Sequence, residues 1–532
     1  MRSEETGTSP SSLQSQATKL AYWLEHLFER VGRSAQEHSW IWVAALTLLY
    51  VACTVAHSFA KPLWFDELFT FYISRTHGWR ERLALGLAEG TCPPAFYGLT
   101  HACLRLFGGN SLAARMPEII GFWLMCICLF LFVRRRCAAI FAFLAMLIPV
   151  GTLAYSYADE ARPYGLILGM AGLSLYSWQS IVEGRRRALA LIFLTVSVAS
   201  GVSSHFYGAQ IVLPLFAGEA CRTLERRKID WGILCAIVLG LAPLAVLVPL
   251  AQKAFAANYR SARSPAVYWA EPHVNGFVGF YSALFEPMLP VLVTSILVTA
   301  VVYGLGGRGS HREESSEQRF PLPELAAAIM YLFVPAVMLL LTWRTTGYYN
   351  HRYALSATLG CVILFVYLSS MLSPNRLAIP CLIMVVLLGH WVGVSARSVR
   401  RMPGPADNLS VGSPLYPKGD ALPIVMPDCI WFLQMAHYST REVTSRLTFL
   451  TDVPHATRRP DLDGEMSLAV CRHVLPGTIE DYHAFLSRHR EIWMLSHGDP
   501  TLEWLPSQLR DEGWKLQYEA QTGNDILFRA SR

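Results

Sequence analysis

Long apolar runs recur along most of this 532-residue chain, up to about residue 400. A helix of about 20 mainly apolar residues is long enough to cross the hydrocarbon core of a bilayer. The spacing predicts about eleven such helices, which begin near Trp40, Leu112, Ala138, Tyr164, Ala188, Tyr207, Trp231, Phe285, Leu325, Tyr353 and Leu377. Because 53% of the residues are hydrophobic and only 16% are charged, we predict an α-helical polytopic membrane protein and exclude an ordinary soluble globular fold.

The predicted organisation has four parts. Residues 1–38 form a polar, cytoplasmic, amphipathic segment without an apparent removable signal peptide. Residues 39–397 form the transmembrane domain, and residues 398–420 have the Pro, Gly, Asp and Ser content of a linker. Residues 421–532 are predicted to form a soluble α/β domain. The stretch from Pro94 to Phe107 is too short to span, so we expect a helix that is half-embedded on one membrane face.

Four strand-like runs mark the C-terminal domain, where helix-like segments separate them. They begin at Leu422, Leu447, Glu491 and Asn524. Cys429 and Cys471 lie in the same region, and a disulfide between them would require this domain to be extracytoplasmic. None of the 12 cysteines has the spacing of a zinc site.

Short blocks of basic residues separate the predicted spans. They are Arg30 and Arg33, Arg134 to Arg136, Arg185 to Arg187, and Arg222 with Arg226, Arg227 and Lys228. All of them fall on one side of the membrane, which the positive-inside rule identifies as the cytoplasm. The alternate loops are therefore extracytoplasmic, and so is the C-terminal domain if the number of spans is odd. These blocks also account for the net charge of +6, so no nucleic-acid partner is indicated.

Polar residues that lie next to the apolar runs converge on the predicted outer side. The outer loops are residues 59–111, 155–163, 253–284 and 343–352. The candidate site residues in or beside the outer loops are Asp66, Glu67, Asp159, Glu160, Arg162, Tyr164, His205, Arg260, Arg263, His351, Arg352 and Tyr353. Ionised groups at this depth persist mainly where they pair with one another or line a wet cavity. Their convergence therefore predicts a polar site at the outer membrane face.

The residue types at this site indicate a chemistry. In the stretch PLWFDELFTFY, Asp66 and Glu67 are adjacent carboxylates, and a carboxylate can accept a proton from a hydroxyl group. Arg162 and Arg352 offer planar, permanently charged donors that suit a phosphate. Together they favour attack of a hydroxyl on a sugar that is carried by a lipid phosphate. The alternative is structural, because acidic residues also cap helix N-termini and arginine is common at the ends of spans.

Four ordered motifs, within about Trp40 to Leu372, carry a family resemblance. They are WFDELFT (64–70), PPAFYGLTHACLRLFGGNSLAARMPEIIGF (93–122), ADEARPYGLILGM (158–170) and YYNHRYAL (348–355). With them the chain resembles the membrane glycosyltransferases of the GT-C superfamily. The resemblance is to the bacterial branch related to dolichyl-phosphate-mannose protein mannosyltransferases and to the lipid A aminoarabinose and galacturonic acid transferases. One departure concerns Thr91 and Cys92, which precede Pro93 where several relatives have a basic residue.

The resemblance implies an inverting transferase in the bacterial inner membrane, with its site on the periplasmic side. The donor would be a polyprenyl-phosphate-linked monosaccharide, and the acceptor a hydroxyl group of a glycolipid, lipid A, a polysaccharide or a protein. Asp66 would be the general base or share that role with Glu67, and Arg352 would face the lipid phosphate. The remaining residues are implied to bind the lipid phosphate (His351, Tyr353, Arg260, Arg263) or the acceptor and donor (Asp159, Glu160, Arg162, Tyr164, His205). No cofactor is implied, although Asp66 and Asp159 could hold a divalent ion.

Two other function classes use the same features. In a transporter or flippase for lipid-linked sugars the charges would line a translocation path, but such proteins usually have internal repeats and charges near the midplane. We find no internal repeat, and the charges cluster at one face. In a membrane-anchored binding protein the C-terminal domain would carry the function, but that domain shows no glycine-rich phosphate loop.

Overall fold

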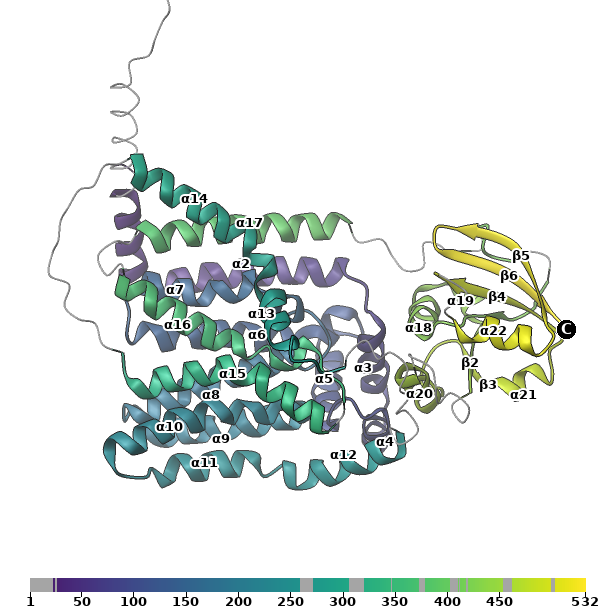
Figure 1. Ribbon diagram of the computed structural model, residues 1–532, viewed down its shortest axis with the longest axis horizontal. Coiled ribbons are helices and arrows are strands. Elements are labelled where there is room, and N and C mark those ends of the chain that lie inside the picture. The colour runs from purple at the N-terminus through teal and green to yellow at the C-terminus, as the bar shows by residue number, and fades with distance from the viewer. Residues whose placement is uncertain are drawn as a thin grey trace, which may run out of the picture.

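The computed structural model combines a bundle of long helices with a C-terminal α/β domain that lies at one end of the bundle (Figure 1). The residues that it describes are 23, 26–258, 271–305, 320–345, 347–372, 378–401, 410, 412–417, 420–452, 462–498 and 503–532. Arg260 and Arg263, predicted to bind a lipid phosphate, lie outside the described residues, as does most of the predicted amphipathic segment before residue 26.

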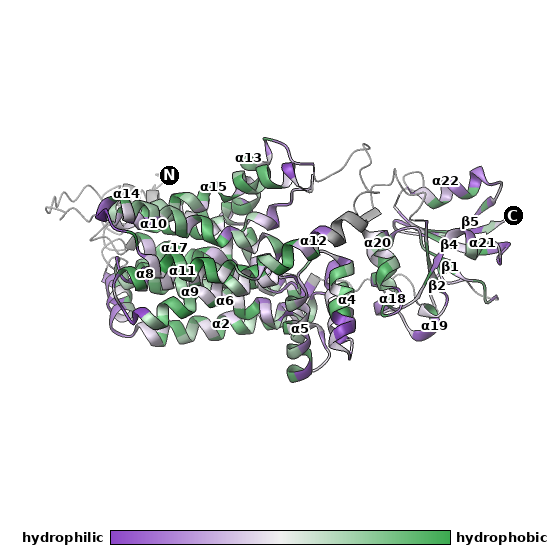
Figure 2. Cartoon of the chain, turned by 90° about the horizontal axis from the view of Figure 1, so that it is seen from below, coloured by the Kyte–Doolittle hydropathy of each residue, from purple (hydrophilic) through white to green (hydrophobic). Residues whose placement is uncertain are grey.

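The helices of the bundle occur at all the predicted span positions. They are α2 (Ser39–Ala60), α6 (Ser111–Arg134), α7 (Ala139–Leu147), α8 (Tyr164–Val182), α9 (Arg187–Ser204), α10 (Val212–Arg226), α11 (Trp231–Leu241), α12 (Leu244–Asn258), α13 (Gly276–Phe285), α14 (Leu289–Leu305), α15 (Leu322–Arg344), α16 (Ala357–Leu372) and α17 (Ala378–Arg401). Their mostly hydrophobic residues distinguish the bundle from the mixed C-terminal domain (Figure 2). The bundle is thus the helical membrane domain expected from the apolar runs.

Within the described ranges, eight helical segments are long and apolar enough to cross a membrane. The other three predicted spans correspond to α7, α10 and α16, which are shorter than a full span. The helix α7 ends before a 3-10 turn at 148–151 that contains Pro149, and proline interrupts the helical hydrogen-bond ladder. One span begins earlier than predicted, at Gly276 instead of Phe285.

Close packing between α6 and α8 depends on glycine. A Cβ atom at Gly121 of α6 would lie 2.4 Å from the Cα of Leu166, and one at Gly169 of α8 would lie 2.4 Å from the carbonyl oxygen of Gly121. Small residues let the backbones of membrane helices approach in this way. The contact places the start of α8, and the turn 158–163 before it, against the N-terminal part of α6.

Three shorter helices cover the end of the bundle that lies nearest the C-terminal domain (Figure 1). They are α3 (Phe65–Arg75), α4 (Trp79–Glu89) and α5 (Pro94–Phe107), all from the loop between α2 and α6. The bounds of α5 are those of the helix that the sequence predicted, and Pro94 opens it where a missing N–H group costs no hydrogen bond. In Figure 1 this layer, with α3 and α4, lies between the bundle and the C-terminal domain.

The C-terminal domain is a sheet flanked by helices, which confirms the predicted α/β fold. Its strands are β1 (Ile424–Val425), β2 (Leu447–Thr451), β3 (Thr478–Asp481), β4 (Glu491–His497), β5 (Lys515–Thr522) and β6 (Asp525–Ser531), and its helices are α18 (Cys429–Tyr438), α19 (Arg441–Thr444), α20 (Leu462–Cys471), α21 (Tyr482–Leu486) and α22 (Trp504–Asp511). The order is β3-β2-β1-β4-β6-β5, parallel from β3 to β4 and antiparallel at β6 and β5. Cys429 and Cys471 are both buried, and the structure does not join them in a disulfide.

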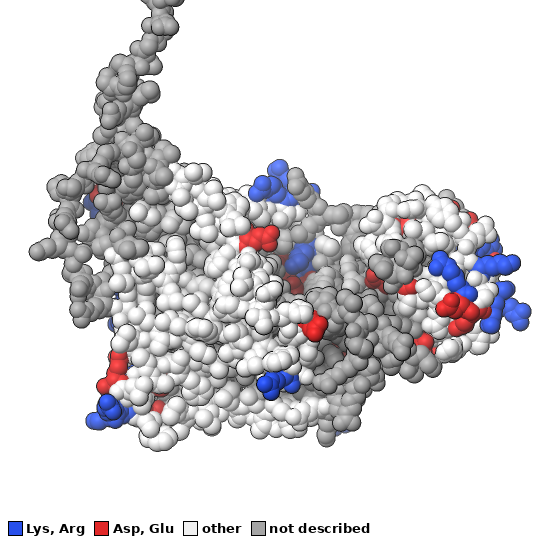
Figure 3. Space-filling model, viewed as in Figure 1, with Lys and Arg blue, Asp and Glu red and all other residues white. Residues whose placement is uncertain are grey.

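The basic blocks meet acidic partners at the other end of the bundle. Arg136 at the end of α6 contacts Glu183 at 2.8 Å and also pairs with Glu324 at the start of α15. Arg222 of α10 lies 2.9 Å from Asp230, which precedes α11. Charged side chains are sparse on the flank of the bundle and gather at its lower left corner and on the C-terminal domain (Figure 3). These blocks therefore lie on one side, as predicted, and the candidate site lies at the opposite end of the same helices.

Candidate active site

Asp66 lies in the first turn of α3 and faces two guanidinium groups. Its Oδ2 atom is 3.0 Å from Nη1 of Arg352 and 3.9 Å from Nε of Arg162. The side chain of Asp66 keeps 21% of its surface exposed. Burial alone would raise the pKa of Asp66, but the charges of Arg162 and Arg352 lower it below its ordinary value. Asp66 is thus an ionised carboxylate that a bound molecule can reach.

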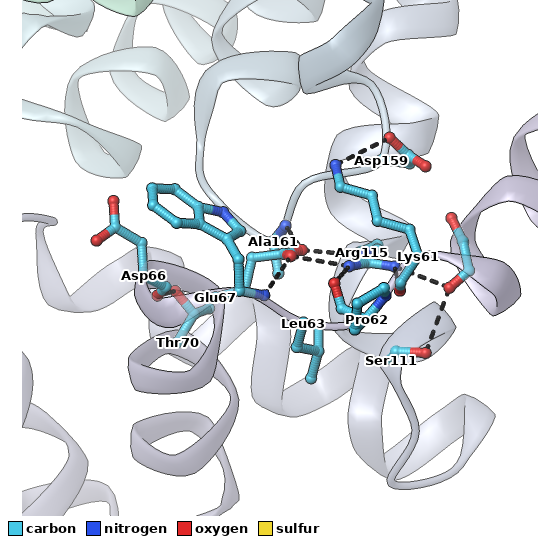
Figure 4. Close-up of polar contacts among 12 residues, drawn as sticks. Lys61, Pro62, Leu63, Asp66, Glu67, Thr70, Ser111, Arg115, Asp159 and Ala161 are labelled. Atoms are coloured by element: carbon cyan, nitrogen blue, oxygen red, sulfur yellow. Dashed lines mark hydrogen bonds and ion pairs between the residues drawn. The ribbon is translucent and has the colours of Figure 1, made fainter. Parts of the chain in front are cut away.

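Glu67, the next residue, points the other way and has no exposed surface (Figure 4). Its two carboxylate oxygens accept hydrogen bonds from Nε and Nη2 of Arg115, at 2.7 and 2.8 Å. They also accept the backbone N–H groups of Ala161 at 2.7 Å and Trp64 at 3.2 Å. Through these hydrogen bonds the Glu67 carboxylate joins α3, α6 and the turn before α8. The structure therefore does not bring Glu67 to the exposed side of Asp66, although the sequence predicted a shared catalytic role.

Arg115 is a residue of this site that the sequence analysis missed. Besides Glu67, it donates hydrogen bonds to the carbonyl oxygens of Ser58 at 2.8 Å, Lys61 at 2.9 Å and Pro62 at 3.1 Å. These carbonyls belong to the end of α2 and to the segment that joins α2 to α3. Its position in the sequence could have indicated this role. Arg115 lies at the start of an apolar span, and a charged side chain buried there requires a partner.

Asp159 is held by the end of α2. Its carboxylate pairs with Nδ1 of His57 and lies 3.5 Å from Nζ of Lys61, and the residue is only 2% exposed. Burial would raise its pKa, but the hydrogen bond from His57 and the charge of Lys61 lower it. Asp159 is therefore an ionised group that ties the turn before α8 to α2. Neither partner was predicted.

Glu160 differs from its neighbour in its surroundings. It is 8% exposed, and within the described part of the chain its Oε1 atom has no hydrogen-bond partner. Burial and the nearby charge of Glu67 raise the pKa of Glu160 to about 7. This carboxyl group therefore changes its protonation state near neutral pH, as a group that holds or releases a proton in a reaction would.

Arg162 and Arg352 supply unused donors beside Asp66. Arg162 is 2% exposed, and among the described residues its Nε and Nη1 atoms have no hydrogen-bond acceptor. The same holds, over the ranges given above, for Nε of Arg352. Buried N–H groups without acceptors are costly in a resting protein. The guanidinium groups of Arg162 and Arg352 lie on either side of the Asp66 carboxylate, and their N–H donors form an environment suited to an anion.

A further acidic residue, Glu89, lies next to Arg162. It ends α4, and its carboxylate accepts hydrogen bonds from the hydroxyl group of Tyr97 at 2.5 Å and the backbone N–H of Thr91 at 3.1 Å. Its Oε1 atom is 3.9 Å from Nη1 of Arg162. Glu89, Arg162, Asp66 and Arg352 thus form a row of alternating charge. Glu89 carried no signal in the sequence, because an acidic residue in a polar loop is ordinary.

Aromatic side chains form a wall beside Arg352. Its guanidinium lies 5.5 Å from the ring centre of Tyr164 and 5.8 Å from that of Tyr353, which are cation–π distances. These residues line a small cavity together with His205 and Tyr207. Burial and the two arginines lower the pKa of His205 to about 3, so its imidazole is neutral, and Nδ1 accepts the backbone N–H of Tyr207 at 3.0 Å.

His351 is next to Arg352 in the chain but contacts other rings. It packs edge-on against Phe280, with ring centres 6.2 Å apart, and against Tyr349 at 5.9 Å. Tyr164, His205, Arg352 and Tyr353 therefore come together as predicted, whereas His351 supports the turn that carries Arg352.

No protein-family model matches the chain, and no curated protein sequence matches it. Several solved structures match its fold, and two of them are structures of ArnT. Over 93% of this chain and 98% of the other, it superposes on ArnT from Cupriavidus metallidurans in the apo state, with a TM-score of 0.58 and 13% sequence identity. It also superposes on ArnT from the same organism bound to undecaprenyl phosphate, over 92% of this chain and 97% of that one, with a TM-score of 0.55 and 13% identity. The helical bundle and the C-terminal α/β domain together therefore share the overall fold of ArnT.

Proposed function

We propose that the protein is an inverting glycosyltransferase. It would move a monosaccharide from a polyprenyl-phosphate carrier to a hydroxyl group of a glycolipid, lipid A, a polysaccharide or a protein. The observation that carries the proposal is the partly exposed carboxylate of Asp66 between the guanidinium groups of Arg162 and Arg352. The match to ArnT bound to undecaprenyl phosphate supports the choice of a polyprenyl-phosphate carrier.

Asp66 is the general base of the proposed reaction. The acceptor hydroxyl attacks the anomeric carbon of the sugar from the face opposite the phosphate and gives its proton to Asp66. A bond forms between the acceptor oxygen and the anomeric carbon, the bond between that carbon and the phosphate oxygen breaks, and polyprenyl phosphate leaves. In the resting site Asp66 is paired with Arg352. A donor phosphate that competes for Arg352 would weaken this pair and make Asp66 more basic when the donor is bound.

The two arginines stabilise the leaving group. Charge grows on the phosphate as the sugar bond breaks, and N–H donors already in place at that point lower the barrier. Among the residues that the structure describes, Arg162 and Arg352 carry such donors without acceptors. Tyr164, Tyr353 and His205 would enclose the sugar, and Glu160 would face the acceptor. The proposed mechanism uses no metal ion or other cofactor.

The other acidic residues have positioning roles in this proposal. Glu67 holds the start of α3 through Arg115, and Asp159 holds the turn before α8 through His57 and Lys61. The proposed location is the periplasmic face of a bacterial inner membrane, because the basic blocks lie at the opposite end of the bundle.

The test compares transfer with translocation in proteoliposomes that contain a labelled polyprenyl-phosphate sugar and candidate acceptors. The proposal predicts free polyprenyl phosphate and an equal amount of sugar on the acceptor, both lost with Asp66→Asn. Movement of intact donor across the bilayer without loss of its sugar would instead identify a flippase and refute the proposal.

A further inference from the structure

The C-terminal domain and the helix that carries Asp66 share one hydrophobic core. Phe65, Leu68 and Phe69 of α3 lie in the same buried cluster as Phe432 and Leu433 of α18. All five side chains are at most 7% exposed. A domain that only sat beside the membrane domain would keep a separate core. The apolar face of α3 is instead completed by α18.

A glycine contact fixes the distance between the two parts. A Cβ atom at Gly464 of α20 would lie 3.2 Å from Cζ of Phe65 and 2.6 Å from Sγ of Cys429. The second distance is shorter than real Cβ contacts allow, so a larger residue there would displace its neighbours. Phe65 immediately precedes Asp66. A shift of α20 would therefore displace Phe65, the residue next to the proposed base.

Polar contacts hold both ends of the same segment. The backbone N–H of Leu63 donates a hydrogen bond to the hydroxyl oxygen of Tyr438, at the end of α18. The hydroxyl group of Tyr72 lies 2.7 Å from Nδ1 of His437. Burial and the charge of Arg75 lower the pKa of His437 to about 4, so the ring is neutral in this contact. The stretch from Leu63 to Tyr72, with Asp66 inside it, is thus held at both ends by neighbouring residues of α18.

A further polar contact between the two parts is weak. Nε2 of His473 lies 3.9 Å from Oε1 of Glu81, and both side chains are about half exposed, at 56% and 46%. Exposed pairs of this kind contribute little. The positional control is therefore concentrated in α18 and α20, where the contacts are buried.

We propose that α18 of the C-terminal domain is a positioning element of the active site, and that Tyr438 is its main positioning residue. Tyr438 does not touch the substrate; it holds Leu63, and through Leu63 the start of α3, so that the Asp66 carboxylate meets the acceptor hydroxyl and Arg352. This inference rests on the proposed function for its catalytic consequence. Its structural part, the hold on Leu63, stands on the contact itself.

The test uses the full-length protein with Tyr438→Phe, which removes the hydroxyl group and keeps the ring. Loss of one such hydrogen bond should lower kcat about two- to tenfold, with the donor KM within about twofold, and should speed amide exchange at Leu63 by a similar factor. Tyr482→Phe is the matched control, because Tyr482 is a buried tyrosine in a separate core cluster of the same domain, away from α3. It should leave both quantities unchanged. His437→Ala should resemble Tyr438→Phe, and His437→Asn, which keeps a polar atom near Nδ1, should restore activity.

A double-mutant cycle separates positioning from general destabilisation. If Tyr438 acts through Asp66, Tyr438→Phe should have no further effect on the residual rate of Asp66→Asn. Equal effects of Tyr438→Phe with and without Asp66 would overturn the inference, and so would unchanged exchange at Leu63. Absence of transfer by the wild-type protein would overturn the proposed function and the catalytic consequence, while faster exchange at Leu63 would still support the structural part.

Discussion

The pair Glu67–Arg115 makes a prediction that separates the two adjacent carboxylates. Glu67→Gln keeps the size of the side chain but removes its charge, and it leaves the Arg115 guanidinium buried without a counter-charge. Both side chains are 0% exposed. Breaking a buried ion pair by removing one partner costs about 3–5 kcal/mol. Gln can still accept some of these hydrogen bonds, and Arg115 keeps three carbonyl partners, so we expect a loss of about 3 kcal/mol, at the lower end of that range.

The assay is the free energy of unfolding, measured by titration with SDS in mixed micelles. Asp66→Asn is the matched control, because Asp66 is partly exposed and its pair with Arg352 is bridged by a single hydrogen bond of 3.0 Å. Its cost should be smaller than that of Glu67→Gln, because Asp66 keeps 21% of its side chain exposed to solvent. Transfer rates are then measured at equal amounts of folded protein, where Glu67→Gln should retain much of the activity. A Glu67→Gln protein with the stability of the wild type but without transfer activity would refute this reasoning and make Glu67 catalytic.

Two further predictions follow from the site. Arg352→Lys should lower kcat/KM for the donor about tenfold to a hundredfold in steady-state transfer assays, because lysine cannot reproduce the planar donors or their stacking on Tyr164 and Tyr353. The control is Arg344→Lys, at an exposed position beside Trp343, which should change kcat/KM little. Equal losses of kcat/KM in the two variants would contradict the role of Arg352. Glu160 has a pKa raised from 4.5 to about 7 in the folded protein, so its contribution to stability is complete below pH 4.5 and is lost as the pH rises through about 7. Relative to Glu160→Gln, the wild type should therefore lose about 3 kcal/mol between these limits in unfolding titrations, and parallel pH profiles would show that Glu160 has an ordinary pKa.

Local patterns in the sequence were sufficient for much of the fold. The helix Pro94–Phe107 was predicted with its observed bounds, because Pro94 opens it and a Gly-Gly pair follows it. Strand β4 was predicted from a buried apolar run. Strand β5, Lys515–Thr522, was missed because it is a largely exposed edge strand without an apolar face. The short helices α7 and α16 belong to runs that are apolar enough for a span, but α7 ends before the turn that contains Pro149 and α16 begins only after the turn at 351–354.

The sequence predicted many of the residues of the site but not which of them form ion pairs with one another. The predicted orientation of the spans placed Asp66, Arg162 and Arg352 on one face. In the structure, guanidinium nitrogens of both arginines lie within 4 Å of the Asp66 carboxylate. The sequence could not show that Glu67 pairs with Arg115, or that Asp159 pairs with His57, because these partners are brought together only by tertiary packing. Adjacent residues at the start of a helix point in different directions, and that geometry, not residue type, separates the roles of Asp66 and Glu67.

The central claim is that Asp66 accepts the proton of the acceptor hydroxyl. The direct test is the single-turnover rate of sugar transfer from a polyprenyl-phosphate donor by Asp66→Asn, at saturating donor and acceptor and at an equal amount of folded protein. The proposed mechanism predicts a rate about 10² to 10⁴ times lower than that of the wild type, with little change in donor binding. A rate equal to that of the wild type would contradict it.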